Sequence, residues 1–494
     1  MIAIQFQKRD FEYDVYNLVK AFYPEEEVAM FDAEHPAGEY DERISLFYGK
    51  NKISICIEKA AGDRQRLEDG VWVCYDADRK ATKNKLKMLL YDMLETRTGQ
   101  KLPWGTLTGV RPTKIPMAFL EEGYSNVEIA QKMREEYLVS AEKTALSIAI
   151  ANRERHILKG IDYKNGYSLY IGIPFCPSIC AYCSFSSSPL KLWKDKVDDY
   201  LDALCLEIRE TAALWKDRTL DTVYIGGGTP TTLEPYQLER LLAEAETYFD
   251  FSHVREYTVE AGRPDSITEG KLAVIKKHPV TRISINPQTM NQKTLDIIGR
   301  KHTVDDIKKA FVLARGLGFD NINMDLIVGL PGEQMDEAEN TMREVVALDP
   351  DSITVHSLAI KRAARLNLFK EEYKEMTFTN NQEIMEMTSR YAAQAGMSPY
   401  YLYRQKNMKG NFENVGYAKP GKEGIYNILI MEEKQSILAL GAGASTKFVM
   451  DDRIERTENV KDIKSYISRI DEMIERKKQG YWKYGKKEIQ DYSI

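Results

Sequence analysis

Several features that would place this 494-residue chain in a specialised class are missing from it. No apolar run approaches the roughly twenty residues that a membrane-spanning helix needs. The N-terminus, Met1-Ile-Ala-Ile-Gln-Phe-Gln-Lys-Arg-Asp10, lacks the charged, then apolar, then small-residue order of a signal peptide. The net charge of −6 leaves no basic excess to displace counterions from nucleic-acid phosphates. We therefore expect a cytoplasmic protein with no membrane span and no nucleic-acid partner.

Cysteine is scarce as well, with six residues in the whole chain. So few do not make a disulfide framework for a protein of this size, and a reducing compartment is expected. Three of them nevertheless share one short window, Cys176-Pro-Ser-Ile-Cys180-Ala-Tyr-Cys183. The other three are interpreted as ordinary interior residues; they are Cys56, Cys74 and Cys205.

The cysteine window suits a [4Fe–4S] cluster, because a folded loop can turn three thiolates to one small face. No fourth cysteine lies nearby, so one iron would keep an open coordination position, as reactive metal sites do. A structural zinc site and a chance grouping of buried thiols stay open as alternatives. A zinc site usually needs a fourth Cys or His at short range. The nearest histidines, His156 and His253, lie 20 and 70 residues from the window.

The length predicts two or three domains, since one hydrophobic core rarely serves 494 residues. Residues 1–100 are predicted to form a small N-terminal α/β domain, and residues 101–164 a helical connector that starts with a breaker-rich loop at 102–112. Within the first domain we expect strands at 44–48, 53–57 and 71–75, the first two as a hairpin, and a helix at 85–95.

From residue 165 the pattern becomes strand, loop and helix in repetition. Six such units predict a parallel sheet with right-handed crossovers. About 200 residues are too few for a full eight-stranded barrel. We therefore predict an α/β fold with a partial (β/α)6 barrel over 165–375 and a mainly helical C-terminal domain over 376–494. The strands are expected at 168–173, 221–226, 255–260, 281–286, 321–328 and 351–358.

In a parallel sheet, functional residues are expected just after each strand. The first strand leads into the cysteines, and the second ends in Gly226-Gly-Gly-Thr-Pro230, whose glycines we expect to expose backbone amides to a ligand. The third strand ends at Glu260, the fourth at Gln288, and the fifth buries Asp325, a carboxylate that needs a partner. Each alone is equally well explained as a cap, a turn or an ion pair, but their order after the cysteine window favours a site.

Together these motifs resemble the radical S-adenosylmethionine (SAM) superfamily. The resemblance is closest to the oxygen-independent coproporphyrinogen III oxidase family, in its HemZ-type branch of coproporphyrinogen dehydrogenases with an extra N-terminal domain. It spans about residues 165–450 and rests on the cysteine window, the Gly-Gly-Gly-Thr-Pro turn and four later stretches. These are His356-Ser-Leu-Ala-Ile-Lys-Arg362, Tyr401-Leu-Tyr-Arg-Gln-Lys-Asn-Met-Lys-Gly410, Asn414-Val-Gly-Tyr417 and Gly441-Ala-Gly-Ala-Ser445.

The resemblance implies cofactors and the residues that hold them. It implies that Cys176, Cys180 and Cys183 ligate a [4Fe–4S] cluster whose fourth iron takes the amino and carboxylate groups of SAM. A first SAM would be lined by Tyr170, Gly228, Thr229 and Glu260. A second SAM would be contacted by Tyr182, Gly227, Gln288, Arg300, Asp325 and Ala359. No catalytic residue is assigned beyond these, and His356 is interpreted as a core histidine.

The implied reaction is the oxidative decarboxylation of two propionates of coproporphyrinogen III to vinyl groups. It gives protoporphyrinogen IX through a 5′-deoxyadenosyl radical, and it needs an electron donor such as a flavodoxin or ferredoxin. A tetrapyrrole with four carboxylates requires cations and aromatic walls. Candidate cations are Lys361, Arg362, Arg365, Arg404, Lys406 and Lys409, beside Tyr400, Tyr401 and Tyr403. That these charges are merely solvated is an equally open interpretation.

Two other functions stay open at this level. One is another radical SAM reaction on a tetrapyrrole or aromatic substrate, such as methyl transfer or ring cleavage. The other is a haem chaperone that keeps the cluster without turning over a substrate. The cationic, tyrosine-rich stretch at 361–409 and the second SAM set favour an enzyme.

Overall fold

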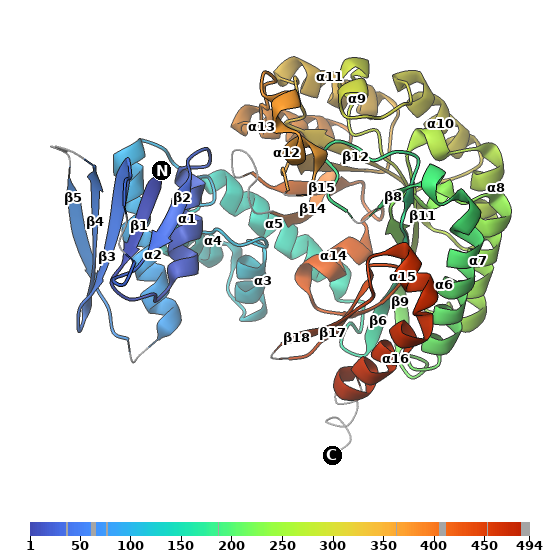
Figure 1. Cartoon of the computed structure of the whole chain (residues 1–494), viewed down its shortest axis with the longest axis horizontal. Coiled ribbons are helices and arrows are strands. Elements are labelled where there is room, and N and C mark those ends of the chain that lie inside the picture. Colours follow the sequence, from blue (N-terminus) through green and yellow to red (C-terminus); the bar gives the residue numbers. More distant parts are fainter. Residues whose placement is uncertain are drawn as a thin grey trace. The chain divides into compact units, whose positions relative to one another are not determined.

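The computed structural model describes residues 1–35, 38–60, 66–75, 78–185, 187–361, 363–404, 412–451 and 453–485. The chain divides into two compact units, drawn in Figure 1. The first unit comprises Met1–Asn152 with Tyr403–Asn411, and the second comprises Arg153–Leu402 with Phe412–Ile494.

The first unit contains a five-stranded sheet in the order β2-β1-β3-β4-β5. Its strands are β1 (Ile2–Phe6), β2 (Val28–Phe31), β3 (Glu42–Tyr48), β4 (Lys52–Lys59) and β5 (Leu67–Trp72). Strands β3 and β4 form the predicted hairpin, and the predicted helix lies within α2 (Arg79–Thr98). Strands β1 and β2 and helix α1 (Glu12–Phe22) were not predicted.

Three helices follow the sheet of the first unit, as the sequence predicts. They are α3 (Lys114–Glu121), α4 (Asn126–Tyr137) and α5 (Ala141–Leu158). Helix α4 begins at a capping box, in which the Ser125 hydroxyl accepts the Glu128 N–H and the Glu128 carboxylate accepts the Ser125 N–H. The loop before these helices is fixed by a hydrogen bond from Thr106 N–H to the Tyr137 carbonyl at 2.8 Å.

The second unit is built on an eleven-stranded sheet, whose centre is the six-stranded parallel arrangement that the sequence predicts. The six strands are β6 (Gly166–Ile173), β9 (Thr219–Gly227), β10 (Glu256–Gly262), β11 (Arg282–Ile285), β12 (Ile322–Val328) and β13 (Ser352–Ser357). They lie in chain order, and each pairs in parallel with the next. The α/β fold with a partial barrel is therefore confirmed.

Helices connect these strands and surround them in Figure 1. Helix α10 shows why: its buried residues Ile307, Ala310, Phe311 and Ala314 recur at helical spacing on one face. It begins at a capping box between Thr303 and Asp306. The other connecting helices are α6 (Val197–Ala212), α7 (Pro235–Tyr248), α8 (Glu269–Lys277), α9 (Gln292–Ile297) and α11 (Met335–Ala347), and α10 itself is Val304–Gly316.

The C-terminal region contains the expected helices and also extends the sheet at both edges. Beyond β13 come β15 (Asn414–Ala418), antiparallel to it, and β14 (Ser398–Tyr403). Beyond β6 come β16 (Ser436–Leu440), parallel to it, then β17 (Ser445–Val449) and β18 (Ile454–Glu458). These five strands were not predicted. The helices are α12 (Arg365–Leu368), α13 (Gln382–Gln394), α14 (Ile425–Glu432), α15 (Ile463–Ser468) and α16 (Ile470–Gly480).

A buried ion pair fastens the last helix to the barrel. Lys477 of α16 lies 2.9 Å from the Glu207 carboxylate of α6, and both side chains are almost fully buried. The same carboxylate accepts hydrogen bonds from Tyr466 Oη at 2.6 Å, Asn459 Nδ2 at 2.8 Å and Gly441 N–H at 2.8 Å. A buried charge needs such partners, and here they join four C-terminal segments to one carboxylate.

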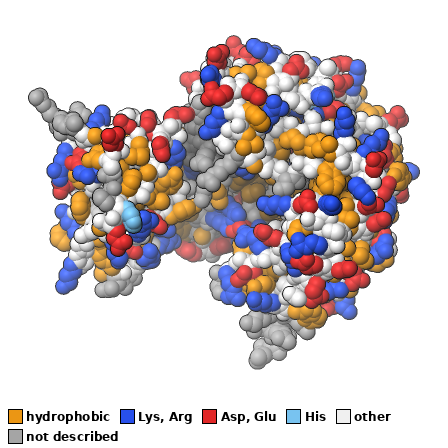
Figure 2. Space-filling view, in the orientation of Figure 1, with side chains coloured by type: hydrophobic (Ala, Val, Ile, Leu, Met, Phe, Trp, Pro, Cys, Tyr) orange, Lys and Arg blue, Asp and Glu red, His pale blue; other side chains and the backbone are white. Residues whose placement is uncertain are grey.

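The surface drawn in Figure 2 intersperses Lys and Arg with Asp and Glu. Among the described helices, none is both long enough and apolar enough to cross a bilayer.

Candidate functional site

Strand register gathers most of the predicted site residues on one face of the second sheet. Aligned residues of neighbouring strands share a face, and so do residues two apart along a strand. By this rule the pairing from β6 to β13 turns five polar side chains to the same side, which we call the inner face. They are Tyr170 of β6, Tyr224 of β9, Glu260 of β10, Asp325 of β12 and His356 of β13.

The three cysteines lie in the loop that follows β6. Strand β7 (Phe175–Cys176) pairs with β8 (Ser188–Pro189) and closes this loop at its base. Inside it, Cys183 N–H donates to the Cys180 carbonyl at 3.0 Å. Burial raises the pKa of Cys176 and of Cys183, and the charge of the nearby Cys180 raises both further. The structure thus brings the three thiols within electrostatic reach of one another.

The arrangement differs from that of a single-ion site. In the described part of the chain, no three Cys, His, Asp or Glu side chains are grouped so as to hold one metal ion. A [4Fe–4S] cluster does not require that grouping, because each cysteine binds a different iron. The sulfur of Cys176 also accepts a hydrogen bond from the buried Thr229 hydroxyl at 3.6 Å.

The glycine turn after β9 is built for close backbone packing. The N–H groups of Gly228 and Thr229 donate to the carbonyls of Ile173 and Phe175, both at 2.7 Å. A Cβ on Gly228 would lie 2.5 Å from the Phe175 carbonyl oxygen. The expectation that the glycine amides are exposed to a ligand is therefore wrong for Gly228, because the Ile173 carbonyl at the end of β6 accepts its N–H.

Glu260 is a carboxylate in an unfavourable position for a charge. Burial raises its pKa to about 7, opposed by the hydrogen bond from Tyr224 Oη, and the negative charge of Asp325 raises it as well. The Tyr224 ring is itself stacked between Tyr170, at a centroid distance of 6.3 Å, and Tyr426 of α14, at 4.5 Å. A cation beside Glu260 would remove the unfavourable interaction.

Asp325 is held as an anion by neighbours on the inner face. Its Oδ1 accepts a hydrogen bond from Asn323 Nδ2 at 2.7 Å, and His356 Nε2 lies 3.9 Å from its Oδ2. Burial acts to raise the pKa of Asp325, but His356, Asn323 and Thr354 together bring it below its ordinary value. His356 therefore lies at the site, where the sequence had suggested a core residue.

Two predicted site residues carry buried polar atoms without partners. Within the described residues, neither Gln288 Oε1 nor Arg300 Nε has a hydrogen-bond partner, although both side chains are more than nine-tenths buried. Gln288 also has φ of +68°, a conformation that costs energy in any residue but glycine. Arg300 Nη1 donates to the carbonyls of Asn286 and Pro287. Orphaned atoms of this kind call for a missing partner.

The remaining predicted residues lie at varied distances from this group. Tyr182 is close enough to Arg300 that the guanidinium opposes the rise in its pKa caused by burial. Ala359 follows Leu358, whose side chain packs in the same apolar cluster as Tyr182. Lys361 is exposed, and its ammonium lies 5.9 Å from the centroid of the Phe185 ring.

Two of the other cations proposed for the substrate have partners of their own. Arg404 is buried in the first unit, where its guanidinium donates to the Leu107 carbonyl at 2.5 Å and its backbone N–H to that of Val110 at 2.7 Å. Arg365 pairs with Glu372 at 3.2 Å. Arg362, Lys406 and Lys409 lie outside the described residues.

Comparison with known proteins agrees with this geometry. Residues 170–345 match the model of the radical SAM superfamily. The oxygen-independent coproporphyrinogen-III oxidase-like protein HemZ of Bacillus subtilis is 39% identical over 472 residues, 93% of each chain. The chain belongs to this HemZ-like family of radical SAM proteins. The haem chaperone HemW of the same organism is 32% identical over 308 residues, which are 62% of this chain and 76% of HemW.

A solved structure shows the same fold. Coproporphyrinogen III oxidase (HemN) from Escherichia coli, described as a radical SAM enzyme, superposes with a TM-score of 0.52 at 24% identity. The match covers 65% of this chain and 73% of HemN.

Membership of the radical SAM superfamily implies a [4Fe–4S] cluster and SAM, and the cysteine loop and the buried polar residues described above fit both. Three thiols in one closed loop suit the cluster. A carboxylate with a raised pKa, Glu260, suits the ammonium of SAM, and the orphaned atoms of Gln288 and Arg300 suit further polar groups. When bound, the cluster and SAM supply a carbon radical able to abstract hydrogen.

Two inner-face residues and one rim residue were missed at the sequence level. Tyr224 stands two residues before Gly226 on the strand whose end was recognised, so strand alternation alone would have found it. Tyr426 could not be found in this way, because it comes from a helix packed against β9. Arg263, whose Nη1 donates to the Cys180 sulfur at 3.7 Å, was visible in the motif after Glu260, where only the carboxylate was considered.

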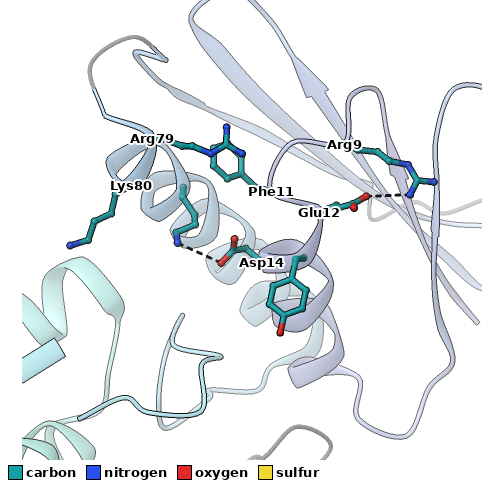
Figure 3. Close-up of a pocket in the computed structure, with 8 residues that line it drawn as sticks. Arg9, Phe11, Glu12, Asp14, Arg79 and Lys80 are labelled. Carbon is teal, nitrogen blue, oxygen red and sulfur yellow. Dashed lines mark hydrogen bonds and ion pairs between the residues drawn. The ribbon is translucent and has the colours of Figure 1, made fainter. Parts of the chain in front are cut away.

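A cavity of about 480 Å³ lies away from these residues, in the first unit. It is shown in Figure 3, where Arg79 packs over the Phe11 ring and Arg9 points at Glu12. Several of its charged side chains already have ion-pair partners, since Lys83 Nζ lies 3.9 Å from Asp14 and Arg9 also binds Asp32 outside the cavity. This cavity contains none of the predicted site residues.

Proposed function

We propose that this protein catalyses the oxygen-independent oxidative decarboxylation of two propionates of coproporphyrinogen III to vinyl groups, giving protoporphyrinogen IX. The proposal is supported by similarity along 93% of the chain to HemZ, a protein named for its likeness to coproporphyrinogen-III oxidases. The HemW match, by contrast, covers 62% of the chain.

The observation that carries the proposal is the presence of two groups of buried polar side chains around the parallel sheet. Glu260, with Tyr170 and Tyr224, forms one. Gln288 and Arg300, with their orphaned atoms, form the other. We propose that the first holds the SAM bound to the cluster and that the second, with Asp325, holds a second SAM. Two propionates are processed, so two equivalents of the radical source are required.

The chain's own residues would have four tasks in this reaction. Glu260 would hold the SAM ammonium, and the loop of Cys176, Cys180 and Cys183 would hold the cluster. The tyrosine layer of Tyr170, Tyr224 and Tyr426 would exclude water from the radical, which attacks most C–H bonds it can reach. We propose that Lys361, an exposed candidate cation whose ammonium lies 5.9 Å from the centroid of the Phe185 ring, contacts a substrate carboxylate.

The decisive experiment uses the full-length chain, reconstituted with iron and sulfide under anaerobic conditions. SAM, a low-potential reductant and coproporphyrinogen III are added, and products are analysed by mass spectrometry. We expect 5′-deoxyadenosine together with two successive losses of about 46 Da, each one CO₂ plus two hydrogen atoms. Methylated tetrapyrrole, or SAM cleavage with an unchanged tetrapyrrole, would exclude the proposed reaction. A flavodoxin or ferredoxin is the proposed physiological electron donor.

A haem chaperone is the second candidate, favoured by the similarity to HemW. It predicts stable haem binding by the purified protein and no consumption of coproporphyrinogen. Haem titration followed by absorbance, on the same preparation, distinguishes the two functions.

A further inference from the structure

Arg263 reaches from the end of β10 to the cysteine loop. Its side chain is 4% exposed, and its Nη1 donates to three acceptors of that loop. These are the Ser178 carbonyl at 3.0 Å, the Ser178 hydroxyl at 2.8 Å and the Cys180 sulfur at 3.7 Å. A single guanidinium nitrogen thus binds the middle of the loop and one of its thiols.

The other side of the guanidinium is locked by a carboxylate. Arg263 Nε and Nη2 donate to the two oxygens of Asp265 at 2.9 and 2.6 Å, a bidentate pair. Asp265 Oδ1 lies 3.6 Å from Nδ1 of His302, whose side chain is fully buried. The backbone is held as well, because Ser266 donates both its N–H and its hydroxyl to the Arg263 carbonyl, at 3.0 and 2.7 Å. The guanidinium therefore has little freedom to move away from the sulfur.

This arrangement exceeds what a loop anchor needs. Ser178 is already fixed by the hydrogen bond from its hydroxyl to the Gly299 carbonyl at 3.0 Å, and Ala181 N–H donates to the Ile298 carbonyl at 3.0 Å. A buried cation donating to a cysteine sulfur stabilises extra negative charge on whatever that sulfur binds. Hydrogen bonds to ligand sulfurs and nearby charge are two factors that set the potential of an iron–sulfur cluster.

We propose that Arg263 is a positioning residue that raises the reduction potential of the cluster through its hydrogen bond to Cys180. Asp265 and His302 hold the guanidinium in place. The inference rests on membership of the radical SAM superfamily and is independent of the substrate.

The test measures the potential of the reconstituted full-length chain without substrate. Anaerobic redox titration followed by electron paramagnetic resonance would compare the parent with Arg263→Gln and Arg263→Lys. We expect Arg263→Gln to give about tenfold less reduced cluster at a fixed potential, which for one electron corresponds to about 59 mV. Arg263→Lys keeps the charge but loses the fork that binds Asp265 and the loop together, so an intermediate shift is expected.

A matched control is Arg240→Gln. Arg240 pairs with Asp202 on the outer helices at 2.6 Å, and its loss should leave the potential unchanged. Equal potentials in the parent, Arg263→Gln and Arg240→Gln would overturn the proposal, even if iron content fell in Arg263→Gln. Should that variant fail to fold, judged by circular dichroism of the metal-free chain, Arg263→Lys decides: a parental potential would overturn the proposal, and a lower one would support it.

Discussion

At the scale of single residues, Glu260 carries an energetic cost that its ligand would remove. Its pKa is raised to about 7, above the ordinary value of 4.5, so the folded protein favours the protonated carboxyl. Stability contributed by this group is therefore complete below pH 4.5 and is lost as the pH rises to 7.

We expect Glu260→Gln to stabilise the metal-free protein at pH 8 by roughly 1 to 2 kcal/mol relative to the parent, and to have little effect at pH 4.5. Thermal unfolding at both pH values measures the difference. Glu475→Gln, on the exposed side of α16, is the control. The same Glu260→Gln variant should bind SAM at least tenfold more weakly after reconstitution. A stability difference independent of pH would contradict this account of the carboxyl.

Gln288 allows a test in which stability and ligand binding separate. Because its Oε1 has no partner within the described residues, Gln288→Met removes no hydrogen bond from that atom. We expect the free energy of unfolding to change by less than about 1 kcal/mol. Equilibrium dialysis of the reconstituted protein should show SAM binding fall from two molecules per chain to one. A parental stoichiometry would exclude Gln288 from a second SAM site.

At the scale of elements, the turn after β9 and the cysteine loop behave as one unit. Gly228→Ala would place a Cβ 2.5 Å from the Phe175 carbonyl oxygen. It would thereby disturb the two backbone hydrogen bonds that the turn donates to the Ile173 and Phe175 carbonyls, just before Cys176. We expect a loss of about 3 kcal/mol in stability and reduced iron binding after reconstitution, measured by denaturant unfolding and iron assay. Gly316→Ala at the end of α10, where nothing lies within 4 Å of the new Cβ, should unfold and load iron like the parent. Normal iron binding by Gly228→Ala would contradict the coupling.

The sequence predicted the strands that are marked by alternating apolar residues and flanking turns, and it missed strands that are defined only by their pairing with distant strands. The strand expected at 221–226 is Thr219–Gly227, and that at 321–328 is Ile322–Val328, because alternation and flanking turns mark both. Strand β16, Ser436–Leu440, was missed, since a short apolar run reads equally as helix or strand. Its assignment depends on pairing with β6, some 270 residues earlier, which no local signal records.

The site residues likewise fall into those that local sequence pattern marks and those that only tertiary packing brings to the site. Glu260 and Asp325 were predictable because each is a carboxylate within a strand that alternation and flanking turns mark. The roles of Arg263 and Tyr426 depend on where a loop and a helix cross the sheet, and these depend on tertiary packing. The prediction of exposed glycine amides was wrong for the same reason. The Gly228 N–H donates to the Ile173 carbonyl of the neighbouring strand, a contact that depends on tertiary packing.

At the scale of the whole molecule, one buried ion pair joins the C-terminal segments to the barrel. Lys477→Met would leave the Glu207 carboxylate charged and buried without its cation, and we expect a loss of about 3 to 5 kcal/mol. Adding Glu207→Gln to that variant should recover much of the loss, because the neutral amide no longer needs a counter-charge. Urea unfolding of the single and double variants measures both effects. A double variant less stable than Lys477→Met alone would show that Glu207 matters mainly through its other hydrogen bonds.

The position of β16 beside β6 has a consequence for how the protein is made. Strand β6, which leads into Cys176, has β9 on one side, and the chain synthesised next supplies that partner. Its other side is filled by Ser436–Leu440, about 270 residues later in the chain. On the ribosome, the strand before the cysteines therefore keeps an unpaired edge until residues 436–440 have emerged. The strand that leads into the cysteine site is completed only then, and iron is expected to enter after that point.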